Sequence, residues 1–309
     1  MDNVFYSVLP IFLIAFLGSV IRKKWLISDE FWRGLEKLSF YVLFPTVLFK
    51  HSSKVDFASS EFLRLTIALI AGNLIVAAAL IVYQARTNYD KVQFTSVFQG
   101  ATRYNNYIFF SVGAALFGSN GLTIIATISP YLLMLTNITA IMSFYYYLPK
   151  DANRTKRKSL AIMSKSIMAN PFILASLAGF IFNYSGLTLN VGIDNTLETI
   201  ADSAFAIGML IVGAGIKLKI EPEYFKQIAL TSAIKLIITP IVTFILLWIL
   251  SVSGTAKSVG ILFSCLPCAT SSYILSRQLG GDPETMSSII TFTTIFSILS
   301  LSTLVYILG

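Results

Sequence analysis

Residues 92–117 read VQFTSVFQGATRYNNYIFFSVGAALF, and this stretch decides the fold. It is long enough to cross a bilayer, since a spanning helix needs roughly 20 residues. Its centre is nevertheless polar, because Gln99, Thr102, Arg103, Asn105 and Asn106 fall close together. Each unsatisfied polar group in hydrocarbon costs several kcal/mol, so a helix that faces lipid would not tolerate this segment. We therefore expect it to face protein or water inside a bundle of membrane helices.

A second stretch of this kind lies at Ser258–Leu279, in the other half of the chain. Pro267 removes a backbone donor there, and Gly100 in the first stretch permits cheap unwinding, so we expect both helices to break. Interrupted polar segments at corresponding positions in two halves are the best sequence indication of a transporter's substrate site.

The composition of the whole chain indicates a membrane protein. Of its 309 residues, 55% are hydrophobic and only 12% are charged, whereas soluble domains have roughly a quarter charged. We predict an all-α integral membrane protein in the lipid bilayer. Its ten transmembrane helices are expected at Val4–Ile21, Phe31–Phe49, Phe62–Tyr83, Val92–Phe117, Leu122–Tyr147, Ser166–Tyr184, Thr196–Ile216, Ile228–Leu250, Ser258–Leu279 and Thr285–Leu308.

The basic residues predict the orientation, since Lys and Arg concentrate in cytoplasmic loops. With the N-terminus outside, four lie on the outer side (Lys50, Lys54, Arg64 and Lys257), and Arg103 and Lys235 lie within helices. The other seventeen of the 23 lie on the inner side: Arg22, Lys23, Lys24, Arg33, Lys37, Arg86, Lys91, Lys150, Arg154, Lys156, Arg157, Lys158, Lys165, Lys217, Lys219, Lys226 and Arg277. We expect a cell-membrane protein with both termini outside. The same clusters explain the net charge of +8, so we expect no nucleic-acid partner.

The chain reads as two related halves, residues 1–147 and 166–309, joined by a basic cytoplasmic linker at residues 148–165. Three short segments recur in order: residues 7–10 resemble 168–171, 35–38 resemble 197–200, and 105–108 resemble 271–274. Because five helices is an odd number, the second half must be inverted in the membrane. The prediction is a 5+5 inverted repeat with broken crossing helices, the fourth and the ninth.

The candidate substrate-binding residues surround the two expected breaks, at Gly100 and Pro267. Half-helix ends present N–H groups to anions and carbonyls to cations. Two membrane-embedded cations beside amides suit a solute with a carboxylate, which Arg binds through two parallel hydrogen bonds. The candidates are Arg103, Asn105, Asn106, Thr270, Ser271, Ser272 and Lys235. Helix packing is the competing interpretation, because small and hydroxyl residues are common where membrane helices touch.

Two further residues are candidates for coupling to sodium or a proton: Asp202 in the seventh helix and Asn137 in the fifth. Asp202 is also a candidate ion-pair partner for the embedded cations. The competing interpretation of Lys235 is a purely structural ion pair or a side chain that snorkels to the membrane interface. Asn137 could instead only bond a neighbouring helix.

The sequence contains no zinc motif, nucleophile elbow or P-loop, so we expect neither an enzyme nor a cofactor or metal site. Cys265 and Cys268 are interpreted as packing residues. Two hypotheses remain. The first is a secondary active transporter that moves a small organic anion by alternating access. The alternative is a channel or a non-transporting sensor on the same scaffold.

The whole chain resembles the auxin efflux carrier family. The resemblance rests on residues 35–38 with 41–45, on residues 99–107, on Asn170-Pro171, on Lys235 with Pro240, and on residues 266–270. It implies a five-plus-five inverted repeat like that of bile acid–sodium symporters, a scaffold domain with a transporter core, and a homodimer. Bacterial members are linked to malonate, malate and similar acids. The plant members have a long central loop and a proline at the crossing in the fourth helix, and this chain has neither.

Overall fold

The computed structural model describes residues 2–55, 60–148, 161, 164, 167–216 and 222–308, and within them all regular structure is helical. The linker predicted at 148–165 and the predicted helix start at Ser166 fall almost wholly outside these residues. The α-helices are α1 (Asp2–Lys24), α2 (Asp29–Leu38), α3 (Phe44–Ser52), α4 (Ser60–Thr87), α5 (Lys91–Thr102), α6 (Asn106–Tyr147), α8 (Pro171–Tyr184), α9 (Val191–Ala214), α10 (Phe225–Ala233), α11 (Thr239–Ile249), α12 (Gly254–Ser264), α13 (Ser272–Leu279) and α14 (Pro283–Leu308). Three short turns complete the set: the π-helical η1 (Ser39–Leu43) and η3 (Ile234–Ile238), and the 3-10 turn η2 (Pro222–Tyr224).

Several of these segments are long and apolar enough to cross a bilayer. Within the described ranges they are Glu61–Thr87, Lys91–Tyr147, Val191–Ala214, Pro222–Ile249 and Pro283–Leu301. The second has 57 residues, and its chain turns at Gly118, where φ is 56° and ψ is −150°. The chain is therefore a multi-pass membrane protein, whereas the exact number of ten spans stays a prediction.

Prolines account for the two π-helical turns and for the position where α8 begins. Pro45 and Pro240 lie two positions after the ends of η1 and η3, and a proline has no N–H to close the ordinary bond to the residue four positions earlier. The backbone N–H groups of Phe44 and Thr239 bond five residues back instead, which is the π-helical pattern. Pro171 was expected inside a helix. It is the first residue of α8, and the Asn170 side chain caps that helix by accepting from the N–H of Phe172 at 2.9 Å.

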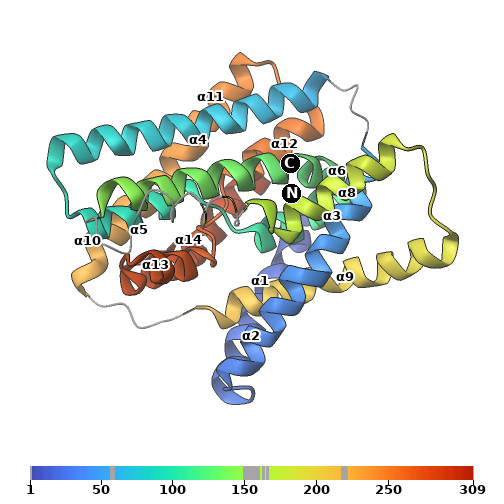
Figure 1. The fold of residues 1–309 in the computed structure, drawn as a ribbon, viewed down its shortest axis with the longest axis horizontal. Helices are drawn as coiled ribbons and strands as arrows, with labels where there is room; N and C mark the ends of the chain where they lie inside the picture. Colours follow the sequence, from blue (N-terminus) through green and yellow to red (C-terminus); the bar gives the residue numbers. More distant parts are fainter. Residues whose placement is uncertain are drawn as a thin grey trace.

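The helices form two groups, with α6 in contact with both (Figure 1). The first group contains α1, α2, α3, α8 and α9, and the second contains α4, α5 and α10 to α14. Glycines bring the backbones of the first group together. A Cβ on Gly213 of α9 would lie 1.6 Å from the carbonyl oxygen of Ala15 in α1, and one on Gly179 of α8 would lie 2.6 Å from that of Phe49 in α3. This group can therefore pack as a unit against the second.

Candidate functional site

Two helix breaks meet inside the second group. The first separates α5 from α6 at residues 103–105, and the second separates α12 from α13 at residues 265–271. The backbone N–H of Asn105 donates to the carbonyl of Pro267 at 3.0 Å, so the breaks are in direct contact. Segments more than 160 positions apart in the chain thus form one non-helical region within the bundle.

Side chains satisfy the backbone groups that the first break exposes. The Asn105 Oδ1 accepts from the N–H of Ile108 at 3.2 Å and caps the start of α6. The Asn73 Nδ2, from α4, donates to the carbonyl of Thr102 at 2.7 Å, at the end of α5. Helix ends that lack water need such partners. The break is therefore held open by two amide side chains.

The sequence predicted a helix break at Gly100, but this prediction is wrong. Gly100 lies within α5, and the break begins at Arg103. A Cβ at this position would lie 2.5 Å from Cγ2 of Thr231 and 2.7 Å from Cγ2 of Ile289. The absence of a side chain lets α5 pack closely against α10 and α14. Pro267 does lie in the second break, as predicted.

The guanidinium of Arg103 lies at the junction of the two breaks. The residue is 7% exposed. Its Nη1 donates to Gln99 Oε1 at 3.2 Å, and its Nη2 donates to Asn137 Oδ1 and to Ser271 Oγ, both at 3.1 Å. All three acceptors are neutral. Asn137, predicted as a coupling residue, is thus a direct partner of Arg103.

Lys235 is a second buried cation of the same group. It is 0% exposed and lies in η3, the π-helical turn that Pro240 produces. Its Nζ lies 5.9 Å from the ring centroid of Phe263, and within the described ranges it has no hydrogen-bond partner. Arg103 is thus bonded to Ser271 of the second break, and Lys235 lies against Phe263 in α12, the helix that leads into that break.

The remaining candidates differ in how they are placed. Ser272 is buried beside Cys268, with 3.6 Å between Oγ and Sγ, whereas Thr270 is half-buried and Ser271 is exposed. Asn106 is half-buried, and its Oδ1 has no partner within the described residues. Asp202 is exposed on α9, in the first helix group. The structure therefore does not bring it to Arg103 or Lys235 as the predicted ion-pair partner.

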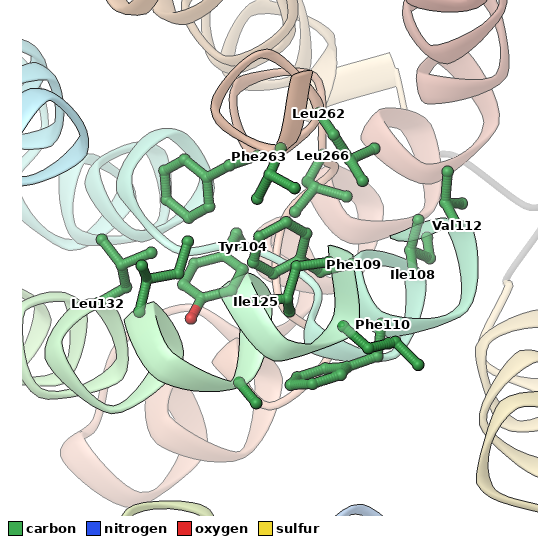
Figure 2. Close-up of a cluster of buried hydrophobic side chains, with 14 of the residues drawn as sticks. Tyr104, Ile108, Phe109, Phe110, Val112, Ile125, Leu132, Leu262, Phe263 and Leu266 are labelled. Carbon is green, nitrogen blue, oxygen red and sulfur yellow. The ribbon is translucent and has the colours of Figure 1, made fainter. Parts of the chain in front are cut away.

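An aromatic cluster closes one side of the region (Figure 2). The Tyr104 ring, from the first break, lies 4.7 Å from that of Phe263 and 5.8 Å from that of Phe109, measured between ring centroids. Leu262 and Leu266 lie beside these rings from the second polar stretch. Tyr104 and Phe109 are essentially inaccessible to solvent. Apolar packing of this kind lowers the local dielectric constant, which strengthens any interaction of Arg103 with an anion.

Sequence reasoning missed two residues of this region as site residues, Gln99 and Asn73. Gln99 lies four positions before Arg103, the spacing of neighbours on one face of a helix, and this spacing could have identified it. Asn73 is an amide within the apolar stretch Phe62–Tyr83, but its partner, Thr102, lies on another helix. Only the three-dimensional packing identifies that contact.

The fold and the paired breaks define a polytopic helical membrane protein with a buried cationic site. The chain belongs to the membrane transport protein family, whose model matches residues 3–306. This is the auxin efflux carrier group that the sequence resembles. The chain is thus a transporter and not an enzyme.

Two relatives match along nearly their whole length. One, from Methanothermobacter thermautotrophicus, is named "Uncharacterized transporter"; it is 24% identical over 299 residues, which cover 96% of this chain and 95% of the relative. The other, from Rhizobium meliloti, is named "Putative malonate transporter"; it is 20% identical over 308 residues, which cover 97% and 94%.

Proposed function

We propose that this transporter is a secondary carrier that moves a small organic anion with a carboxylate group by alternating access. The observation that carries the proposal is Arg103, a buried guanidinium at the meeting point of two helix breaks, whose hydrogen-bond partners among the described residues are all neutral. An Arg side chain has five donors in a fixed fork and stays charged in proteins. A carboxylate that takes the place of the Ser271 hydroxyl on Nη2 would fit this fork and supply the missing negative charge.

The amides and hydroxyls around Arg103 complete the proposed binding site. Asn105 Nδ2 and Asn106 Oδ1 are buried atoms without partners in the described ranges, and such atoms are costly unless a ligand satisfies them. Ser271 is exposed while it binds Arg103, which gives a solute a route to the guanidinium. The name of the Rhizobium meliloti relative makes malonate the first acid to test.

Alternating access would move one helix group against the other. A cavity of about 350 Å³ lies between α1, α6 and α9, with Pro10, Ser111 and Phe205 among its lining residues. This is where the first group borders α6, so a relative movement would change the cavity. In this proposal the fourth and ninth of ten helices cross at the site, and the second half repeats the first in inverted form.

A ligand screen by thermal unfolding tests the substrate class. A ligand that binds only the folded state raises the unfolding temperature by mass action. We expect malonate, malate, succinate or acetate to stabilise the purified protein, and malonamide, which has the same shape as malonate without the charges, to have no effect. Equal stabilisation by malonamide would exclude a carboxylate-specific site. Saturable counterflow in proteoliposomes then separates a carrier from a channel or a sensor.

A further inference from the structure

The helices that carry the two breaks contain cations and no acids. Residues 91–147 contain no Asp or Glu, and neither do residues 224–281. These ranges hold α5, α6, both breaks and Lys235. No described carboxylate lies within salt-bridge distance of Arg103 or Lys235. Within the described residues, therefore, no acid neutralises Arg103 or Lys235.

Three acids on neighbouring helices have other partners or are exposed, and none of them contacts Arg103 or Lys235. Glu61, at the start of α4, accepts a hydrogen bond from Ser253. Glu284, at the start of α14, accepts from the Tyr224 hydroxyl at 2.9 Å. Asp202 on α9 is exposed. None of the three supplies a counter-charge to the breaks.

The thiol of Cys268 does not supply the negative charge either. Its Sγ lies 3.8 Å from the carbonyl oxygen of Gln99 and 3.6 Å from that of Ala269. Both atoms are acceptors, so their lone pairs favour the protonated thiol and disfavour a thiolate. Arg103 also keeps its proton in proteins. The empty site therefore contains at least one uncompensated charge.

We propose that the protein is an obligate anion exchanger whose empty form does not reorient. This inference rests on the proposed function and deepens it. An anion bound at Arg103 compensates the buried positive charge, so the loaded helix group can move through the low-dielectric centre of the membrane. Without an anion, the same movement exposes an unpaired charge to hydrocarbon, which is costly. In such an exchanger, the anion carried back in the opposite direction drives transport, and no coupling sodium ion or proton is needed.

Proteoliposomes test this with labelled malonate outside and either unlabelled malonate or buffer alone inside. Valinomycin and equal potassium on both sides hold the membrane potential at zero, so that charge movement does not limit net uptake. We expect uptake into malonate-loaded vesicles to exceed uptake into buffer-filled vesicles by roughly a hundredfold, since the penalty for one embedded charge corresponds to about two decades in rate. Replacing sodium with potassium should leave the exchange rate unchanged.

Equal uptake into loaded and buffer-filled vesicles would overturn the exchange mechanism and leave the proposed function intact. Dependence on sodium would also overturn it. If neither malonate nor acetate, succinate or malate is taken up under any condition, the proposed function itself fails. Lys235→Gln removes one of the charges and should bring the two rates closer together. Arg277→Gln, which removes an exposed cation on α13, should leave their ratio at the wild-type value.

Discussion

At the scale of single residues, the shape of the Arg103 side chain matters as much as its charge. Arg103→Lys keeps the charge but removes the planar fork that binds both oxygens of a carboxylate. One charge-assisted hydrogen bond contributes about 1.5–3 kcal/mol, so we expect the affinity for the transported acid to fall at least about tenfold. Titration of thermal stability with the acid measures this change. Arg277→Lys, at an exposed position, is the matched control, and unchanged affinity of Arg103→Lys would mean that charge alone suffices.

Asn105 has two roles that different substitutions can separate. Its Oδ1 caps α6, while its Nδ2 is buried without a partner in the described chain. Asn105→Ala removes both groups and should cost about 1 kcal/mol of stability, the usual value of an N-cap, as well as transport. Asn105→Ser keeps a capping oxygen and removes the amide N–H groups. We expect it to unfold near the wild-type temperature but to transport poorly; normal counterflow by this variant would remove Asn105 from the binding site.

At the scale of helices, the sequence predicted the two breaks because polar residues interrupted otherwise apolar stretches. It could not predict their limits. A glycine in the sequence is compatible with unwinding or with close packing, and only the contacts of Gly100 with Thr231 and Ile289 decide for packing. The hydrogen bond from Asn73 to the carbonyl of Thr102 joins two helices, so neither helix alone predicts it. The sequence also did not indicate that the Asp202 side chain is exposed. Partners between helices depend on rotation about each helix axis, which apolar periodicity does not fix in so hydrophobic a chain.

The contact between α1 and α9 depends on the absence of side chains. Gly213→Ala would place a methyl group 1.6 Å from the carbonyl oxygen of Ala15, so the two helices must move apart. Overpacking of this kind typically costs about 1–3 kcal/mol, and we expect a clear loss of thermal stability in detergent. Gly34→Ala is the control, since Gly34 lies inside α2 and a methyl group added there would have nothing within 4 Å. That variant should gain about 0.5–1 kcal/mol from helix propensity, and an equal loss in both variants would contradict the packing argument.

At the scale of the whole molecule, the loops sort into two ends. At one end, the Asn183 side chain donates to the carbonyl of Val55 at 2.6 Å, and the Lys50 ammonium lies 3.5 Å from the Asp194 carboxylate. At the other end, Tyr224 bonds to Glu284, and the Ser96 hydroxyl donates to the carbonyl of Asp282 at 3.1 Å. The first end joins loops that the charge pattern assigns to the outside, and the second joins loops that it assigns to the inside.

Because the loops lie at two ends, the protein can have only two orientations in the membrane, with either end facing the cytoplasm. The basic residues predict which end faces the cytoplasm. Seventeen Lys and Arg fall on one side and four on the other, so we expect the C-terminus outside and the central linker in the cytoplasm. The native thiols should give little background, because Cys265 is 6% exposed and Cys268 is 0% exposed. In intact cells, a membrane-impermeant maleimide should label a cysteine added after Gly309 and spare Ala152→Cys, which lies in the linker outside the described residues. A permeant maleimide should label both and so show that both cysteines are reactive. Labelling of Ala152→Cys alone by the impermeant reagent would invert the topology and place the basic linker outside the cell.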